Sequence, residues 1–269
     1  MAPLLALVAG LLVLTPLSLR PSPRAEAASV PPAQESYVAP SAEVFGQSAG
    51  GIPLTAYWLG SGPTVVVVQG ALHGGPEANT SALTFQLRDY FASHPDQIPP
   101  GVRLAFIPEA NPDGIATNRR LYLSGVDPNR NWDTPEWQSD AYDSDGRFVP
   151  GLGGPRPMSE PETRLFADWV LALRPAAVIQ YHSRGGFIVG ARELSEPYAE
   201  ASGYYLPRPG GGVGGLLPYR ATGSLGRWLS EQGIPAILIE LASASAPEFD
   251  RNLAGLRAVL RVVTQRATS

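Results

Sequence analysis

The sequence predicts an α/β fold, a single-domain sandwich in which a mixed, largely parallel central β-sheet is flanked by helices. Two observations carry this prediction. Short apolar runs alternate along the chain with longer segments whose apolar residues recur at helical spacing. Residues 65–68 are consecutive valines without polar alternation, which is typical of a strand buried on both faces of a parallel sheet. With 269 residues and 44% hydrophobic content, the chain can bury a sizeable core.

An N-terminal segment precedes the expected domain. Residues 4–19 are mainly apolar and are soon followed by the small-residue sequence Ala25-Glu26-Ala27. We therefore expect residues 1–27 to be a secretory signal peptide and the proline-containing residues 28–44 to be a flexible lead-in. No later stretch reaches the roughly 18 apolar residues of a membrane span, so we expect no membrane contact beyond the signal segment. The expected location is secreted or extracytoplasmic, cell-wall association included.

Within residues 45–269 the apolar pattern predicts a regular alternation of elements. Strands are expected at residues 52–58, 64–68, 102–108, 176–181 and 235–239. Helices are expected at residues 78–93, 159–173, 223–232 and 249–264. Ser159 and Glu162 have the spacing of a capping box, which indicates that the second of these helices begins there. Residues 133–156 show no hydrophobic period and predict a long surface loop.

The composition excludes several classes of function. There are no cysteines, so a disulfide framework, a thiol nucleophile and a zinc–thiolate site are ruled out. The net charge of -4 argues against a basic groove for nucleic acid. Only three histidines are present, and their positions therefore decide most of the functional argument.

Two of these histidines and two acidic residues follow or end predicted strands. His73 and Glu77 lie in the segment 69–77 that comes directly after the 64–68 strand, His182 follows the 176–181 strand, and Glu240 follows the 235–239 strand. Ligands bind at the carboxyl edge of parallel strands, so these side chains can converge there on one metal. Separately, each has a plain structural interpretation: His73 as a loop histidine, Glu77 as a helix N-terminal acid and Glu240 as a salt-bridge partner.

Other polar residues have more ordinary interpretations. The segments Asn111–Gly114 and Gly125–Trp132, with Arg119 and Arg120 between them, suit carboxylate binding but would also stabilise loops. His94 follows a predicted helix and is expected to be a solvated cap. The sequence around Ser48 matches the nucleophile-elbow pattern, but a strand follows it instead of a helix, so a hairpin turn is expected.

Taken in order, these motifs resemble those of the carboxypeptidase A-like zinc metallocarboxypeptidases, in the bacterial branch similar to murein peptide amidases. The resemblance runs from about Phe45 to the C-terminus and rests on residues spread along that length. They are His73, Glu77, Asn111–Gly114, Arg120, Asn129–Asn131, His182, Tyr219 and Glu240. It implies a zinc carboxypeptidase-like catalytic domain over residues 45–269 and one Zn²⁺ as cofactor.

The resemblance also assigns roles to individual residues. His73, Glu77 and His182 would hold the metal, although the family's usual H-x-x-E spacing is here H-x-x-x-E. Glu240 would be the general base for a zinc-activated water, and Arg120 would stabilise the oxyanion. Three residues would bind the substrate: Asn129 and Arg130 its terminal carboxylate, and Tyr219 as a mobile cover.

The function expected from these roles is hydrolysis of a C-terminal peptide amide bond. The substrate would be a peptide with a free C-terminal carboxylate. A peptide derived from peptidoglycan is one such substrate. Two alternatives stay open: a non-catalytic module that binds peptide carboxylates, and a related zinc amidohydrolase or deacylase. The preferred C-terminal residue is also open, since the pocket-floor position falls on Gly226 or, with a one-residue shift, on Arg227.

Overall fold

The computed structural model describes residues 40–208, 216 and 219–267. The expected signal peptide (1–27) and residues 28–39 of the lead-in lie outside the described residues, and so do most of the residues just before Tyr219. In the described part of the chain, the helices are too short or too polar to cross a bilayer.

A seven-stranded mixed sheet forms the centre of the domain, with strand order β1-β2-β4-β3-β7-β9-β8. Its strands are β1 (Ser41–Gln47), β2 (Pro53–Gly60), β3 (Thr64–Gln69), β4 (Val102–Ile107), β7 (Ala177–Ser183), β8 (Phe187–Gly190) and β9 (Ala236–Leu241). The four central strands, β4, β3, β7 and β9, are parallel, while β1, β2 and β8 pair antiparallel at the two edges. The fold class predicted from the sequence is therefore confirmed.

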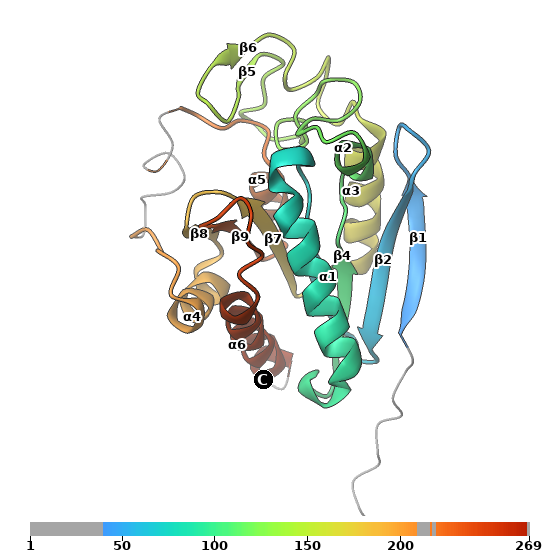
Figure 1. The fold of residues 1–269 in the computed structure, drawn as a ribbon, viewed down its shortest axis with the longest axis vertical. Helices are drawn as coiled ribbons and strands as arrows, with labels where there is room; N and C mark the ends of the chain where they lie inside the picture. Colours follow the sequence, from blue (N-terminus) through green and yellow to red (C-terminus); the bar gives the residue numbers. More distant parts are fainter. Residues whose placement is uncertain (1–39, 209–215, 217–218, 268–269) are drawn as a thin grey trace, which may run out of the picture. The chain divides into compact units, whose positions relative to one another are not determined.

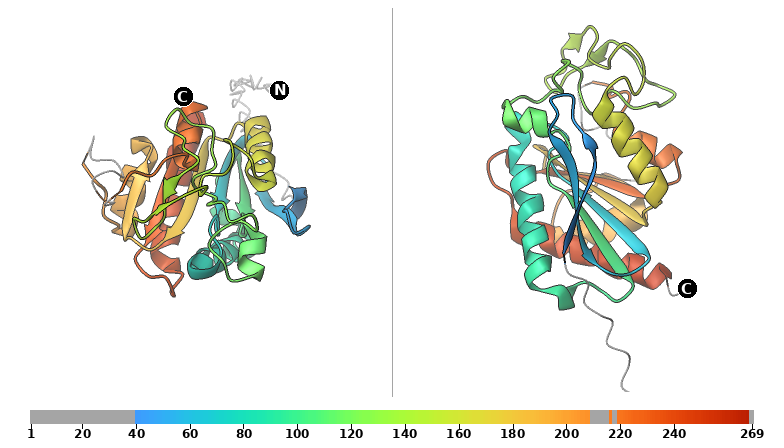
Figure 2. Two further views of the ribbon diagram at one scale, coloured as in Figure 1. Left: turned by 90° about the horizontal axis from the view of Figure 1, so that it is seen from above. Right: turned by 90° about the vertical axis from the view of Figure 1, so that its right-hand side faces the viewer.

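Helices cover both faces of this sheet, as the side view in Figure 2 shows. One face packs against α1 (Ala78–Ser93), α4 (Arg192–Ser202) and α6 (Phe249–Ala267), whose apolar residues share one buried cluster with alternate residues of the central strands. The other face packs against α3 (Pro161–Leu173) and α5 (Leu225–Glu231) in a second cluster. Two cores, one on each face, therefore fix the orientation of every central strand.

The loops that follow the parallel strands gather at one end of the sheet (Figure 1). Here β3 leads through the short 3₁₀ helix η1 (Gly75–Glu77) into α1, and β4 leads into the short helix α2 (Pro112–Ala116). The predicted long loop lies at the same end and contains one small hairpin of two-residue strands, β5 (Ala141–Tyr142) and β6 (Phe148–Val149). This end of the sheet corresponds to the edge at which the sequence placed the candidate residues.

Two boundary predictions were wrong. Residues 41–44, assigned to the flexible lead-in, form the first half of β1 and pair with residues 55–58 of β2. They form an exposed edge strand, which carries little hydrophobic signal. The capping box at Ser159 and Glu162 is also absent: α3 begins at Pro161, with Glu160 as its N-cap. Proline favours the first helical position, and this moves the cap one residue past Ser159.

Sequence patterning missed the short helix α2, the small β5–β6 hairpin, and the elements β8 and α4 between β7 and α5. Strand β8 follows the Gly185-Gly186 pair, and α4 contains Pro197 in its interior. Because glycine and proline normally interrupt regular structure, the sequence pattern predicted neither β8 nor α4. The four predicted helices, α1, α3, α5 and α6, occur where they were expected, α1 with the predicted boundaries. Ser48 lies in the turn between β1 and β2, as expected, and its amide donates to the carbonyl of Ile52.

Candidate metal centre and active site

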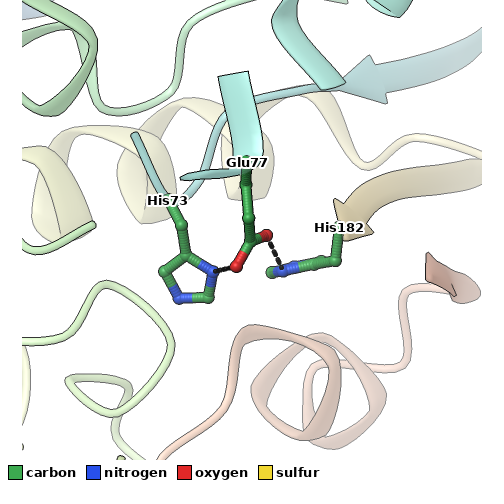
Figure 3. Close-up of side chains that lie close together, drawn as sticks. All are labelled: His73, Glu77 and His182. Atoms are coloured by element: carbon green, nitrogen blue, oxygen red, sulfur yellow. Dashed lines mark hydrogen bonds and ion pairs between the residues drawn. The ribbon is translucent and has the colours of Figure 1, made fainter. Parts of the chain in front are cut away.

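His73, Glu77 and His182 come together at the carboxyl end of the central strands, and all three side chains are buried. The Glu77 carboxylate lies between the two imidazoles (Figure 3). Its Oε1 is 2.8 Å from Nδ1 of His73, and its Oε2 is 3.2 Å from Nδ1 of His182. One donor atom from each residue lies within 4.8 Å of the other two. Two imidazole nitrogens and a carboxylate oxygen are a donor set that zinc prefers, so the residues fit that metal.

The extra residue in the H-x-x-x-E motif is accommodated by the turn between β3 and α1. Gly75 adopts a φ of 55°, which favours glycine, and a side chain on Gly74 would collide with the backbone of Gly114. The following 3₁₀ helix then directs Glu77 back toward His73. Glu77 also accepts a hydrogen bond from the amide of Ser183, 3.2 Å away, which ties it to the end of β7.

Behind His73 lies a buried ion-pair network built on Asp127. Oδ1 of Asp127 is 3.0 Å from Nε2 of His73, on the opposite side of the ring from Glu77. Arg120 contacts both carboxylates, through Nη1 to Glu77 and through Nε to Asp127 at 3.3 Å. Asp127 was not among the predicted site residues, although it lies in the Asn/Arg segment that sequence analysis singled out. The sequence feature that could have identified Asp127 is its position three residues before Arg130, in a loop that contains several arginines.

The electrostatics of the cluster follow from these contacts. Burial raises the pKa of the Glu77 carboxyl, but His73, His182 and Arg120 outweigh it and hold that pKa well below its ordinary value. Burial likewise raises the pKa of Asp127, which Arg120 and His73 bring well below its usual range. Burial lowers the pKa of His182. Both acids are therefore ionised at neutral pH, as metal ligands and their supporting groups must be.

Glu240 lies on β9 directly opposite His182 on β7, in parallel register. Side chains at paired positions of adjacent parallel strands point to the same face, so the carboxyl group is beside the cluster. It is half-buried, and burial together with the negative charge of Glu77 raises its pKa to about 7. A carboxyl group with a pKa near the working pH is suited to accept and return a proton.

The three predicted substrate-binding residues lie on the loops around this cluster. Arg130 is buried and donates to the carbonyls of Asn129 and Tyr142, but among the described residues it forms no ion pair with a carboxylate. Asn129 accepts a hydrogen bond from the amide of Leu225 and so also holds the start of α5. Tyr219 stacks on Tyr142, and its ring centre is 5.9 Å from the Arg130 guanidinium.

His94, by contrast, takes no part in the site. It is the exposed C-cap of α1, stacked on Tyr90 and within hydrogen-bonding distance of the Tyr90 carbonyl, as the sequence predicted. The candidate site thus uses two of the three histidines of the chain.

The fold and the buried His-Glu-His cluster define a zinc-dependent peptide hydrolase. Comparison with protein families supports this directly, because residues 39–202 match the zinc carboxypeptidase family, which is well over half of the chain. The chain belongs to that family.

Comparison with individual proteins gives the same result. The chain is 28% identical to murein peptide amidase A of Escherichia coli over 239 residues, which cover 84% of this chain and 88% of the relative. The crystal structure of a murein-tripeptide amidase from Escherichia coli superposes with a TM-score of 0.61 at 24% identity, covering 84% of this chain and 94% of the other. Carboxypeptidase A from Helicoverpa armigera gives a TM-score of 0.69 at 17% identity, covering 86% and 70%. The two structural matches establish the shared fold.

Proposed function

We propose that this protein is a secreted metallocarboxypeptidase that hydrolyses the C-terminal amide bond of a peptide, with Glu240 as general base. The observation that carries the proposal is the register pair of His182 and Glu240, which sets an acid of raised pKa beside three buried metal-ligating groups. The similarity to murein peptide amidase A favours a cell-wall peptide as the substrate.

Each residue then has a defined task. When bound by His73, Glu77 and His182, zinc would act as a Lewis acid that polarises the scissile carbonyl and makes water more acidic. Glu240 takes a proton from the attacking water and transfers it to the leaving nitrogen as the C–N bond breaks. Arg120 donates hydrogen bonds toward the carbonyl oxygen as that oxygen becomes negative.

Arg130 selects for the end of a chain. Arg130 is buried and forms no ion pair with a carboxylate of the described residues, and a terminal carboxylate would supply such a partner. A peptide bond in the middle of a chain has no such charge. Tyr219, packed beside Arg130, covers the bound carboxylate.

The test compares two peptides that differ only at the C-terminus, one ending in a free carboxylate and the other in a carboxamide. The zinc-loaded protein is expected to release the last residue from the first peptide only, and chelation should abolish the release. Parallel assays with peptidoglycan-derived peptides would identify the substrate source. Equal cleavage of both peptides would contradict the role of Arg130, and binding without cleavage would indicate a non-catalytic binding module.

A further inference from the structure

The side chain of Asn79 joins three segments that adjoin the candidate site. Asn79 is the second residue of α1, two positions after Glu77, and it is 7% exposed. Its Oδ1 accepts a hydrogen bond from Oγ of Ser183, 2.8 Å away at the end of β7. Its Nδ2 donates to the carbonyls of Ser243, at 2.7 Å, and Ala246, at 3.1 Å, in the loop that follows β9. One amide thus connects the start of α1 with the ends of β7 and β9.

These contacts use both donors and the acceptor oxygen of the Asn79 amide. None of them caps α1, whose N-cap is Glu77 and has no side-chain hydrogen bond. Asparagine is unfavourable inside helices, because its side chain competes for backbone hydrogen bonds. The partners of Asn79 lie 104 to 167 positions away in the sequence. The residue is therefore explained by contacts between distant segments and not by the helix that contains it.

On the β7 side, Ser183 contacts the start of α1 twice. It follows the metal ligand His182, and its amide donates to Oε2 of Glu77 at 3.2 Å, while its hydroxyl donates to Asn79. The end of β7 is therefore fixed against α1 by two hydrogen bonds. Asn79 supplies the one that does not involve a metal ligand.

Backbone pairing between β7 and β9 stops just past the candidate site. The last register pair is Ser183 with Leu241, one residue beyond the pair of His182 and Glu240. The ends of paired strands open more readily than their centres. Asn79 bonds to Ser183 at the end of one strand and to the loop after the other. It therefore braces the two strands beyond their last backbone pair.

The loop that Asn79 holds forms a compact turn. The amides of Ser245 and Ala246 each donate to Oγ of Ser243 at 3.0 Å, and the amide of Ser243 donates to Oε1 of Glu248 at 2.8 Å. Residues 244–246 are exposed, so little packing holds them in place. The two hydrogen bonds from Asn79 therefore fix this turn against the start of α1.

We infer that Asn79 is a positioning residue that holds the end of β9, and with it Glu240, in place against the metal ligands. This inference rests on the proposed function, in which Glu240 transfers protons beside the metal. A general base must lie within hydrogen-bonding reach of its proton donor, and a displacement of about 1 Å can cost about 100-fold in rate. Asn79 is uncharged and acts on the site through the backbone of the segments that it joins.

The experiment makes two measurements on the zinc-loaded Asn79→Ala protein. Its kcat on a peptide with a free C-terminal carboxylate should fall by about 10- to 100-fold with little change in KM. Amide hydrogen exchange at residues 243–246 should become about 10-fold faster or more, because the turn has lost both bonds to α1. Ser81→Ala is the matched control. Ser81 is also buried near the start of α1, but its hydroxyl donates to Glu109, and its replacement should change neither quantity.

Three results would overturn the inference: an unchanged kcat, a fall in kcat that Ser81→Ala shares, and exchange at residues 243–246 that is no faster. If Asn79→Ala fails to fold, Asn79→Asp keeps the shape and the acceptor for Ser183 but loses both donors, and it should show the same faster exchange. Absence of hydrolysis by the wild type would contradict the proposed function instead. The exchange measurement would then decide by itself whether Asn79 holds the end of β9.

Discussion

Nε2 of His73 lies 3.0 Å from a carboxylate oxygen of Asp127, while Nδ1 of the same ring faces Glu77. With its proton on Nε2 and directed at this carboxylate, the ring would offer the lone pair of Nδ1 to a metal. Both residues are buried, so water cannot replace Asp127 as the acceptor without rearrangement. We propose that Asp127 positions His73 as a metal ligand.

We expect Asp127→Asn to weaken zinc binding by about 10- to 100-fold, because the neutral amide orients and polarises the His73 ring less strongly. Competition with a chromogenic chelator would measure the dissociation constant. Asp133→Asn, at an exposed position, is the control and should bind zinc like the wild type. Unchanged zinc affinity in a folded Asp127→Asn protein would show that the contact is structural only.

Glu240→Gln should reduce kcat by about 10²- to 10⁴-fold while zinc stays bound in the same stoichiometry, because the amide cannot accept the proton. Rate measurements on saturating peptide and metal analysis of the same sample separate the two effects. Glu200→Gln, at an exposed position on α4, should behave as the wild type. Retained activity in Glu240→Gln would assign the proton transfer to another group.

Arg130→Gln should lower kcat/KM for peptides with a free terminal carboxylate by about 100-fold or more, since it removes a buried charged partner. It should also reduce the preference for the carboxylate over the carboxamide peptide. The exposed Arg261→Gln on α6 serves as the control. A variant that lost activity equally on both peptides would place Arg130 in the scaffold of the loop, through its bond to the Tyr142 carbonyl.

The sequence predicted the central part of the site because the fold itself brings it together. His73, His182 and Glu240 follow or end parallel strands, and the carboxyl ends of such strands meet at one edge of the sheet. Strand prediction therefore placed these three residues near one another before any contact was known. Glu77 departs from the family's usual spacing by one residue, and the 3₁₀ helix that begins at Gly75 explains how it still reaches His73.

Asp127 could not be identified in this way, because its importance depends on burial and on partners distant in sequence. Asp127 meets His73 across 54 residues. The same limit explains the error at α3. Ser159 bonds to the side chains of Asn131 and Glu160, and Glu162 bonds to the hairpin at Ala49. Local spacing alone predicted a capping box between them.

The carboxyl group of Glu162 should make the free energy of unfolding depend on pH. Its Oε1 accepts a hydrogen bond from the amide of Ala49, 2.8 Å away, whereas Oε2 has no partner among the described residues. Burial, with contributions from the Asp113 and Glu160 charges, raises the pKa of this carboxyl above its ordinary value. The folded state thus binds the proton more tightly than the unfolded state. The free energy of unfolding must therefore fall as pH rises from the ordinary carboxyl pKa through the raised one.

Glu162→Gln removes this ionisation while an amide oxygen can still accept the bond from Ala49. The variant should be more stable than the wild type at pH 7, with a smaller difference at pH 4, where the native carboxyl is largely protonated. Urea unfolding at both pH values measures the two differences, and the exposed Glu200→Gln should show neither. A stability difference that is the same at both pH values would mean that Glu162 does not titrate in this range. Its effect on folding would then come only from its contact with the β1–β2 hairpin.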